Sequence, residues 1–342
     1  MKTSKALKYR FRIASLWNRI AWVIFILIAF QSLSISGRAS PPLPKHKLVY
    51  VGMILGKGGL GDRSFNDSAY AGLKMAQRLF GIRFHAITHT SDKLNMKELL
   101  ALIHQRYDLI IGLGYENAGY IRSLAKKFPT LKFAVVDIVV RARNVSSILF
   151  REHEGDFLMG VLAAMLTKTK KVGFIGGMDI DVIRRIEAGF KQGVTYQDQK
   201  VEVMSDMAGT FAHPEKGRTI ALAQYQAGVD VIYNAAGRTG LGIIQAAKES
   251  GKLTIGTSGD QRHLAPGHVV GNRPKRVDRA ILIIVENLIR GQFTPGVQSL
   301  GLAEGGLGLG PFDEKIVTPS MVERLEALKQ MIIERKLLVR PD

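Results

Sequence analysis

Short apolar, β-branched runs alternate with segments of helical periodicity along most of this chain, and no other feature constrains its fold as strongly. Strands separated by helices pair in parallel, because each crossover helix lets the next strand run in the same direction. We expect strands at residues 47–55, 83–88, 108–113, 132–137, 171–176, 201–206, 229–234, 253–257 and 268–271. We expect helices near residues 66–80, 95–105, 117–127, 155–167, 182–193, 215–226, 239–250 and 275–290, then a last helix capped by Thr318 with Pro319 in its first turn. The pattern predicts an α/β protein.

The chain also repeats itself weakly. The segment "AGLK" recurs as "AGFK", and "YDLIIGLG" at 107–114 recurs as "VDVIYNAAG" at 229–237. In each half a helix, another strand and an aspartate follow, Asp137 in one and Asp260 in the other. Such spacing predicts two similar lobes, each with a doubly wound parallel sheet, and a ligand cleft at the carboxyl ends of their strands. A hinge-closing solute receptor is the most economical interpretation.

A glycine-rich loop, "GKGGLGDRSFNDSAY" at 56–70, satisfies the G-x-G-x-x-G pattern of dinucleotide sites. The next strand ends without the acid that would bind a ribose, and Asp62 would repel a pyrophosphate, so we reject that hypothesis. Two interpretations stay open. The loop is a turn in which Asp62 or Ser64 caps a helix, or Phe65 and Asn66 offer a ring and an amide to a ligand.

The N-terminus predicts export. Residues 1–19 carry cations and no acid, residues 20–30 are apolar, and small residues stand at Gly37 and Ala39. This order is typical of a secretory signal, so we expect 1–39 to be a signal peptide or an N-terminal membrane anchor, followed by a linker at 40–46.

Composition excludes several classes of site and partner. The chain of 342 residues has no cysteine, which rules out disulfides, thiolate chemistry and a cysteine-anchored lipoprotein. The formal charge of +19 comes from scattered cations, so we expect no nucleic acid partner. The predicted location is the periplasm or the cell membrane.

Several motifs then occur in a familiar order. They are "GDRSFNDSAYAGL", "YDLIIGLG", "KFAVVD", "FREHEGDFLMGVLAAMLTKTKKVGFIGGMDIDVIRRIEAGFKQGV", "GTFAHPEKGR", "ALAQYQAGVDVIY", "AAKESGK", "GDQRHLAPG" and "KRVD". From about residue 47 to 310 the chain resembles the basic membrane protein family, the purine-nucleoside receptors of ABC importers. The block at 150–194 is the most specific part of this resemblance.

The resemblance implies a type I periplasmic-binding-protein fold whose two lobes are joined by a hinge. We expect residues 47–150 and about 260–295 in lobe 1, and 151–259 and about 296–342 in lobe 2. The implied function is capture of a purine nucleoside or related compound and its delivery to an ABC transporter permease. No cofactor and no metal is implied, and we expect a monomer.

The resemblance also implies residues on the base side of the ligand. Phe65 would stack on the base, and Asn66 would bond its edge. Asp137 would read the base from the end of a strand. Phe211 would line the other side of the cleft, and Tyr233 would add to the aromatic wall.

On the sugar side, the resemblance implies that Lys275 donates to the ribose hydroxyls. The family motif G-V-D-S-D-Q is here "GTSGDQ", which leaves Asp260 as its acid and puts Thr257 or Ser258 where the first acid would bond the sugar. Arg238 stands where glycine is common and adds a cation close to the cleft. The sequence therefore predicts an altered sugar side.

Two other functions compete with the receptor. Asp137 and Asp260 could form an acid–base pair across the cleft, as in a nucleoside hydrolase. A membrane-anchored ligand sensor or regulator on the same fold is the other alternative. A metal triad of Glu152, His153 and Glu154 is excluded, because adjacent residues on a helix diverge in direction.

Overall fold

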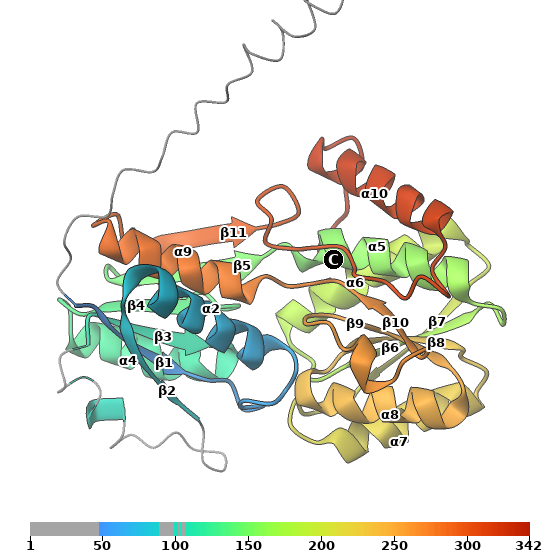
Figure 1. The fold of residues 1–342 in the computed structure, drawn as a ribbon, viewed down its shortest axis with the longest axis horizontal. Coiled ribbons are helices and arrows are strands. Elements are labelled where there is room, and N and C mark those ends of the chain that lie inside the picture. The colour runs from blue at the N-terminus through green and yellow to red at the C-terminus, as the bar shows by residue number, and fades with distance from the viewer. Residues whose placement is uncertain (1–47, 89–98, 102, 104–106) are drawn as a thin grey trace, which may run out of the picture. The chain divides into compact units, whose positions relative to one another are not determined.

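The computed structural model describes residues 48–88, 99–101, 103 and 107–342, which belong to one compact unit (Figure 1). The predicted signal or anchor at 1–39, the linker at 40–46 and most of the helix predicted at 95–105 lie outside the described residues. Within the described part of the chain, no helix has the length and apolar character needed to cross a membrane.

A six-stranded parallel sheet forms the first lobe, in the order β11-β5-β4-β3-β1-β2. Its strands are β1 (Tyr50–Ile54), β2 (Arg83–Ile87), β3 (Leu109–Leu113), β4 (Lys132–Val136), β5 (Val145–Phe150) and β11 (Gly296–Leu300). Its helical elements are α2 (Phe65–Phe80), η1 (Tyr115–Asn117), α4 (Ala118–Lys127) and α9 (Val277–Ile289), and α2 packs on α9. The central strands β3 and β4 are buried almost throughout, as strands covered on both faces must be.

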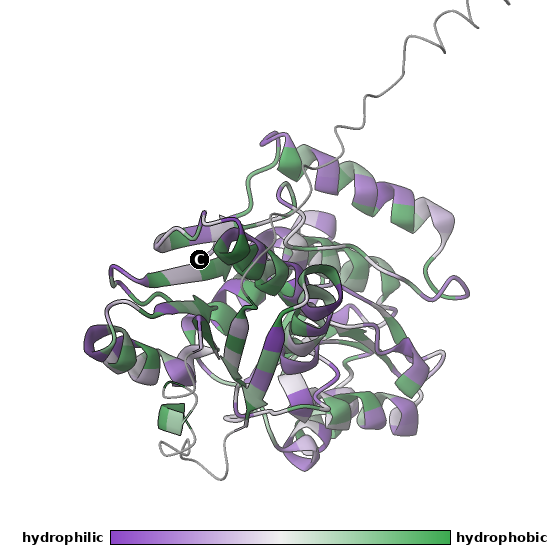
Figure 2. Cartoon of the chain, turned by 60° about the vertical axis from the view of Figure 1, so that its left-hand side comes forward, coloured by the Kyte–Doolittle hydropathy of each residue, from purple (hydrophilic) through white to green (hydrophobic). Residues whose placement is uncertain are grey.

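A five-stranded parallel sheet forms the second lobe, in the order β10-β9-β8-β6-β7. Its strands are β6 (Lys171–Gly176), β7 (Glu202–Met207), β8 (Val231–Ala235), β9 (Leu253–Gly256) and β10 (Val269–Asn272). The helical elements around it are α5 (Glu152–Leu166), α6 (Asp181–Gln197), α7 (Pro214–Gln226), η2 (Gly237–Thr239), α8 (Gly240–Ser250), η3 (Arg262–Leu264) and α10 (Pro319–Ile333). Figure 2 shows hydrophobic residues through the strands and two-sided colouring around the outer helices.

The predicted repeat is present in the topology. The orders β2-β1-β3-β4-β5 and β7-β6-β8-β9-β10 are the same, so both lobes are doubly wound in one pattern. Asp108 and Asp230 occupy corresponding places before β3 and β8. Asp108 accepts from the Tyr50 backbone N–H at 2.9 Å, and Asp230 accepts from those of Lys168 and Thr169 at 2.7 and 3.1 Å. Each acid thus ties its strand to the start of the neighbouring one.

Two strands, and the places where the chain passes back between the lobes, differ from expectation. The strand β5, "VSSILF", was not predicted because Ser146 and Ser147 interrupt its apolar run, although both are buried. The edge strand β11 was not predicted because it is largely exposed. The chain returns to the first lobe after β10 rather than near 260, and 296–300 lies in the first sheet rather than the second. Periodicity identifies strands but not their partners.

The last helix begins as the sequence predicts. Thr318 is the N-cap of α10, and its side chain accepts from the Met321 backbone N–H at 3.4 Å. Pro319 occupies the first turn, where a missing N–H costs nothing.

Candidate ligand-binding cleft

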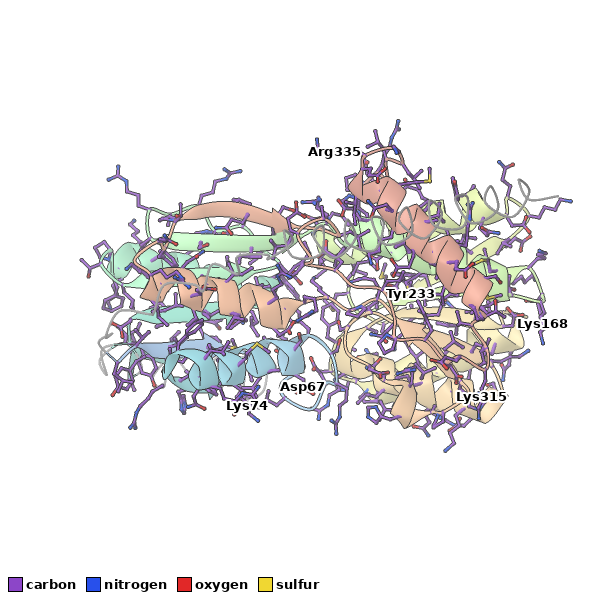
Figure 3. All side chains as sticks on the ribbon, turned by 45° about the horizontal axis from the view of Figure 1, so that its top comes forward. Asp67, Lys74, Lys168, Tyr233, Lys315 and Arg335 are labelled. Carbon is purple, nitrogen blue, oxygen red and sulfur yellow. The ribbon has the colours of Figure 1, made fainter. Side chains whose placement is uncertain are left out.

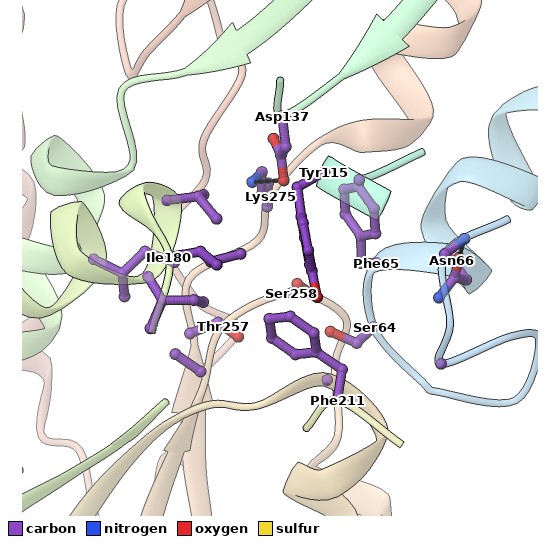
Figure 4. Close-up of a pocket in the computed structure, with 18 of the residues that line it drawn as sticks. Ser64, Phe65, Asn66, Tyr115, Asp137, Ile180, Phe211, Thr257, Ser258 and Lys275 are labelled. Carbon is purple, nitrogen blue, oxygen red and sulfur yellow. Dashed lines mark hydrogen bonds and ion pairs between the residues drawn. The ribbon is translucent and has the colours of Figure 1, made fainter. Parts of the chain in front are cut away.

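A cavity of about 560 Å³ opens at the carboxyl ends of the strands of both sheets, a size typical of small-molecule sites. The first lobe contributes segments that follow β1, β3 and β4, and the second lobe contributes segments that follow β6, β8 and β9. Figure 4 shows the residues that face it. Of the predicted site residues, it is lined by Phe65, Asn66, Asp137, Phe211, Arg238, Ser258 and Lys275.

The glycine-rich loop is built around a buried acid. The Asp62 carboxylate accepts from the backbone N–H groups of Ser64 and Asn66 at 2.8 and 2.9 Å, and from that of Asp67 at 3.2 Å. Burial raises the pKa of Asp62, although these hydrogen bonds oppose the shift. Asp62 therefore caps α2, whereas the Ser64 side chain makes no capping bond. A phosphate cradle would need these N–H groups, so the rejection of a dinucleotide site is consistent with the geometry.

The Asn66 side chain, predicted to bind the edge of a base, forms hydrogen bonds within the glycine-rich loop. Its Oδ1 accepts from the Gly56 backbone N–H at 2.7 Å, and its Nδ2 donates to Asp62 at 2.9 Å. The side chain is buried but still lines the cavity. Its position leaves one Nδ2 hydrogen for a ligand.

Three aromatic rings line the cavity. Phe65 is the first residue of α2, and Phe211 lies in the loop after β7. Tyr115, which sequence analysis missed, comes directly after β3 in η1 (Figure 4). Its position at the carboxyl end of a predicted strand was the available signal. Phe211 packs so closely on Gly177 that a Cβ there would overlap its ring, so glycine sets the position of the ring.

The charged centre of the cleft is a buried network around Lys275. Its Nζ lies 2.6 Å from Asp137 Oδ2 and 2.9 Å from Glu152 Oε1, and Arg185 lies 3.3 Å from Glu152. Burial raises the pKa of Asp137, and Lys275 only partly offsets that effect. Burial also opposes ionisation of Glu152, but Lys275 and Arg185 together hold its pKa below the usual value.

Two features of this network were not predicted from the sequence. Glu152, at the first position of α5, belongs to it, and only an acid at the start of a long apolar helix signalled that role. Asp137 has a φ of 69°, a left-handed conformation that aspartate adopts more readily than most residues. Its Oδ1 is buried and makes no hydrogen bond within the described residues.

The second lobe supplies hydroxyls and a contact to the first lobe. Thr257 and Ser258 follow β9 and line the cavity. Arg238 Nη1 donates to the Gly58 carbonyl at 3.4 Å, so the unusual arginine contacts the glycine-rich loop of the other lobe. Its predicted proximity to the cleft agrees with this position.

Tyr233 does not line the cavity, contrary to expectation. It is fully buried in β8, its hydroxyl donates to Asp156, and its ring stacks on Phe190 with centroids 5.0 Å apart. Figure 3 shows Tyr233 within the second lobe, whereas Lys168 and Lys315 lie at its surface. The side chain leaves the middle of a strand toward the helices that cover the sheet, and only residues at strand ends reach the cleft.

Asp260 is also absent from the cavity lining. Its side chain is 43% exposed and forms an ion pair of 2.9 Å with Arg262. The residue after β9 that corresponds to Asp137 after β4 is Thr257, and Asp260 lies three positions farther along the loop. The structure therefore does not bring Asp137 and Asp260 together as an acid–base pair facing the cavity.

Comparison with known proteins agrees with this geometry. Residues 49–340 match the family model of PnrA-like ABC transporter substrate-binding proteins, called Bmp. Basic membrane protein A of Borreliella burgdorferi is 31% identical, with 94% of this chain and 95% of the relative covered. The ABC transporter nucleoside-binding protein BmpA of Lactococcus lactis is 33% identical, with 82% and 86% covered.

Solved structures agree on the fold. A solute-binding protein of an ABC transporter system from Aeropyrum pernix has a TM-score of 0.77 at 30% identity and covers 86% of this chain and 94% of its own. A transcriptional activator of the comK gene from Bacillus halodurans has a TM-score of 0.74 at 20% identity, with 85% and 100% covered, and shows the fold alone. The predicted type I periplasmic-binding-protein fold is confirmed. The chain belongs to the extracytoplasmic PnrA-like family of ABC transporter substrate-binding proteins, and its role is to bind a substrate.

Proposed function

We propose that the protein binds a neutral purine nucleoside reversibly in this cleft and delivers it to an ABC permease. The observation that carries this proposal is a set of aromatic rings beside a charge-compensated polar centre. Phe65, Tyr115 and Phe211 offer faces for a flat base, and Lys275 with Asp137 offers a donor and an acceptor. The name of the Lactococcus lactis relative, a nucleoside-binding protein, supports the same ligand class.

The charges around the cavity favour a neutral ligand over a nucleotide. The lining cations are Lys57, Arg185, Arg238, Arg273 and Lys275, and the lining acids, equal in number, are Asp62, Glu116, Asp137, Asp179 and Asp181. Lys275 and Arg185 are already paired with acids. A phosphate beside Lys275 or Arg185 would have to break these pairs in a buried place, which costs more than binding at the surface.

Each predicted contact has a physical purpose in this proposal. Stacking on an aromatic ring contributes about 1–3 kcal/mol per base, and a hydrogen bond to a charged group about 1.5–3 kcal/mol. Phe65 and Phe211 stack on the base, Asp137 accepts from its edge, and Lys275 donates to the sugar. Ser258 replaces an acid on the sugar side, and Arg238 closes the entrance from the second lobe.

Export and assembly complete the proposal. Residues 1–39 direct the chain out of the cytoplasm as a cleaved signal or a retained anchor, and no cysteine is present for a lipid anchor. The protein works as a monomer, as expected for a receptor whose cleft is formed by one chain. Light scattering after gel filtration tests the oligomeric state.

The decisive experiment is a thermal-shift and calorimetric screen of nucleosides, free bases, nucleotides, sugars and amino acids. A nucleoside at a hundred times its Kd stabilises the folded protein by about 2.7 kcal/mol, which is readily observed. Adenosine, guanosine and inosine are expected to stabilise it, and their phosphates are not. Stabilisation by sugars or amino acids alone would overturn the proposal. Release of free base from a bound nucleoside would favour the hydrolase instead.

A further inference from the structure

Part of the cavity surface is aliphatic. It is lined by Ile138, Val139, Leu149, Ile180, Val182, Ile183 and Ile186, which we call the aliphatic wall. These residues come from the loop after β4, from β5 and from the N-terminal turns of α6, so both lobes build the wall. In Figure 4, Ile180 lies on the opposite side of the pocket from Phe65.

The aliphatic wall is open to the cavity rather than buried in a core. Ile183 and Ile186 are buried, but the other five side chains are only half-buried. Each of them lines the cavity. Apolar side chains left uncovered inside a binding site gain stability when a ligand covers them. The wall is therefore a surface that an apolar group completes.

Ile180 strengthens this point because it occupies a position where a polar residue would stabilise the fold. It is the N-cap of α6 and makes no side-chain capping bond. Serine, threonine, aspartate or asparagine is preferred there, since a side-chain oxygen satisfies a free backbone N–H. An isoleucine at this position is unfavourable for the helix and favourable for the cavity.

The surroundings of Ile180 do not suit a polar or anionic substituent. The exposed acids Asp179 and Asp181 flank it, and Asp179 is paired with Arg184 at 2.6 Å. Arg184 offsets the charge of Asp179, but Asp181 would still repel a phosphate at this place. A hydroxyl packed against the wall would lose its water without gaining a partner, which costs free energy.

We propose that the aliphatic wall is a subsite for an alkyl or thioether substituent on the ligand. This inference rests on the proposed function, and it narrows the ligand to nucleosides in which an apolar group replaces or extends a polar one. The 5′ carbon of the sugar and the exocyclic amine of the base are two positions that can carry such a group.

Calorimetry with three probes tests the inference: adenosine, 5′-deoxy-5′-methylthioadenosine and N6-(3-methylbut-2-enyl)adenosine. We expect one of the two apolar probes to bind at least about tenfold tighter than adenosine, the gain from burying about two methylene groups. The probe that gains affinity identifies whether the substituent belongs to the sugar or to the base.

Variants of the wall provide the controls. Ile180→Thr supplies the missing capping oxygen, so its thermal midpoint should equal or exceed that of the wild type, while the preference for the apolar probe falls below about threefold. Val182→Thr keeps the side-chain shape and should act in the same direction. Val203→Thr, an equally conservative change on β7 away from the cavity lining, should keep the full preference.

The outcomes separate the two proposals. If adenosine binds and neither apolar probe binds tighter, the aliphatic subsite is wrong and the proposed function stands. Equal weakening of all three probes by Ile180→Thr would also overturn the subsite. If no nucleoside binds at all, the proposed function itself fails.

Discussion

The two lobes have the same strand order but present different chemistry at corresponding strand ends. After β4 the first lobe places Asp137, a buried acid paired with Lys275, whereas after β9 the second lobe places Thr257, an uncharged hydroxyl. The repeated topology thus sets where a side chain enters the cleft, and the individual residue sets what it can bind. An alignment of the halves by their acids alone pairs Asp137 with Asp260, which lies outside the cavity lining.

The segment after β10 carries two cations, Arg273 and Lys275, that pair with acids in different parts of the molecule. Arg273 is fully buried and pairs with Asp156 of α5 at 2.7 Å, which anchors the crossing chain to the second lobe. Lys275, two residues later, reaches Asp137 of the first lobe and Glu152. Both cations line the cavity, but the Arg273 pair lies within the second lobe, whereas Lys275 joins acids of the two lobes. The variants below separate these two pairs.

The largest effect is expected from Lys275→Met. It leaves Asp137 and Glu152 buried without their shared cation, so we expect a loss of about 3–5 kcal/mol in the free energy of unfolding. Urea denaturation at pH 7 measures it. The neighbouring Arg276→Met removes a more exposed pair with Asp278 and should cost less than about 1 kcal/mol. Acidification should reduce the Lys275→Met defect, because protonation removes the unpaired charges.

The next largest effect is a pH dependence of the free energy of unfolding that arises from Asp156. Burial raises its pKa to about 6, even though Arg273 and Tyr233 oppose the shift. A raised folded-state pKa contributes stability that is complete below the unfolded value near 4 and is lost as pH rises through about 6. The stability of the wild type relative to Asp156→Asn should therefore fall by up to about 3 kcal/mol between pH 4 and pH 7.5.

A partly exposed acid, Asp198, supplies the control for that pH series. Lys170 holds the pKa of Asp198 below its usual value, so the sign reverses. The wild type should gain stability relative to Asp198→Asn as pH rises toward the unfolded value near 4, and the difference should then stay constant up to pH 7.5. Urea unfolding of all three proteins at several pH values measures both slopes. Parallel slopes for the two variants would contradict the assignment.

Ligand affinity compares the corresponding strand ends directly. Asp137→Asn removes a charged acceptor. We expect nucleoside binding to lose about 1.5–3 kcal/mol of free energy, which raises the Kd roughly tenfold to more than a hundredfold. Thr257→Val removes one hydroxyl and should weaken binding by about 0.5–1.5 kcal/mol. Calorimetry on both variants measures the difference. A larger loss from Thr257→Val would show that the second lobe, and not the first, recognises the ligand.

The two aromatic rings, one on each lobe, are expected to contribute less to affinity than Asp137. Phe65→Ala and Phe211→Ala should each weaken nucleoside binding by about 1–3 kcal/mol, because each removes one stacking face. A double variant that loses much less than the sum of the two would show that the rings enclose one base together. Binding of free ribose, if it is detectable, should not change. Unchanged nucleoside affinity in both single variants would contradict stacking.

Much of the fold was predictable from the sequence. Every predicted strand is present within a few residues. The central strands are apolar because they are buried on both faces, whereas the edge strands β2 and β7 alternate in exposure. Strands β5 and β11 were missed, since Ser146 and Ser147 disguise one and exposure disguises the other. For the site, Phe65, Asp137, Phe211 and Lys275 line the cavity as expected, and Tyr233 does not.

The sequence by itself determined the α/β architecture, the duplicated lobes and the family, whereas the structure showed that Asp62 caps the loop before α2. These features depend on local periodicity, turn chemistry and short motifs, which are written in consecutive residues. Only the tertiary structure decided that Glu152 shares Lys275 with Asp137, that Thr257 rather than Asp260 lines the cavity, and that aliphatic side chains line it as well. Those contacts join residues far apart in the chain, and the direction of a side chain at a strand end is set by packing rather than by spacing.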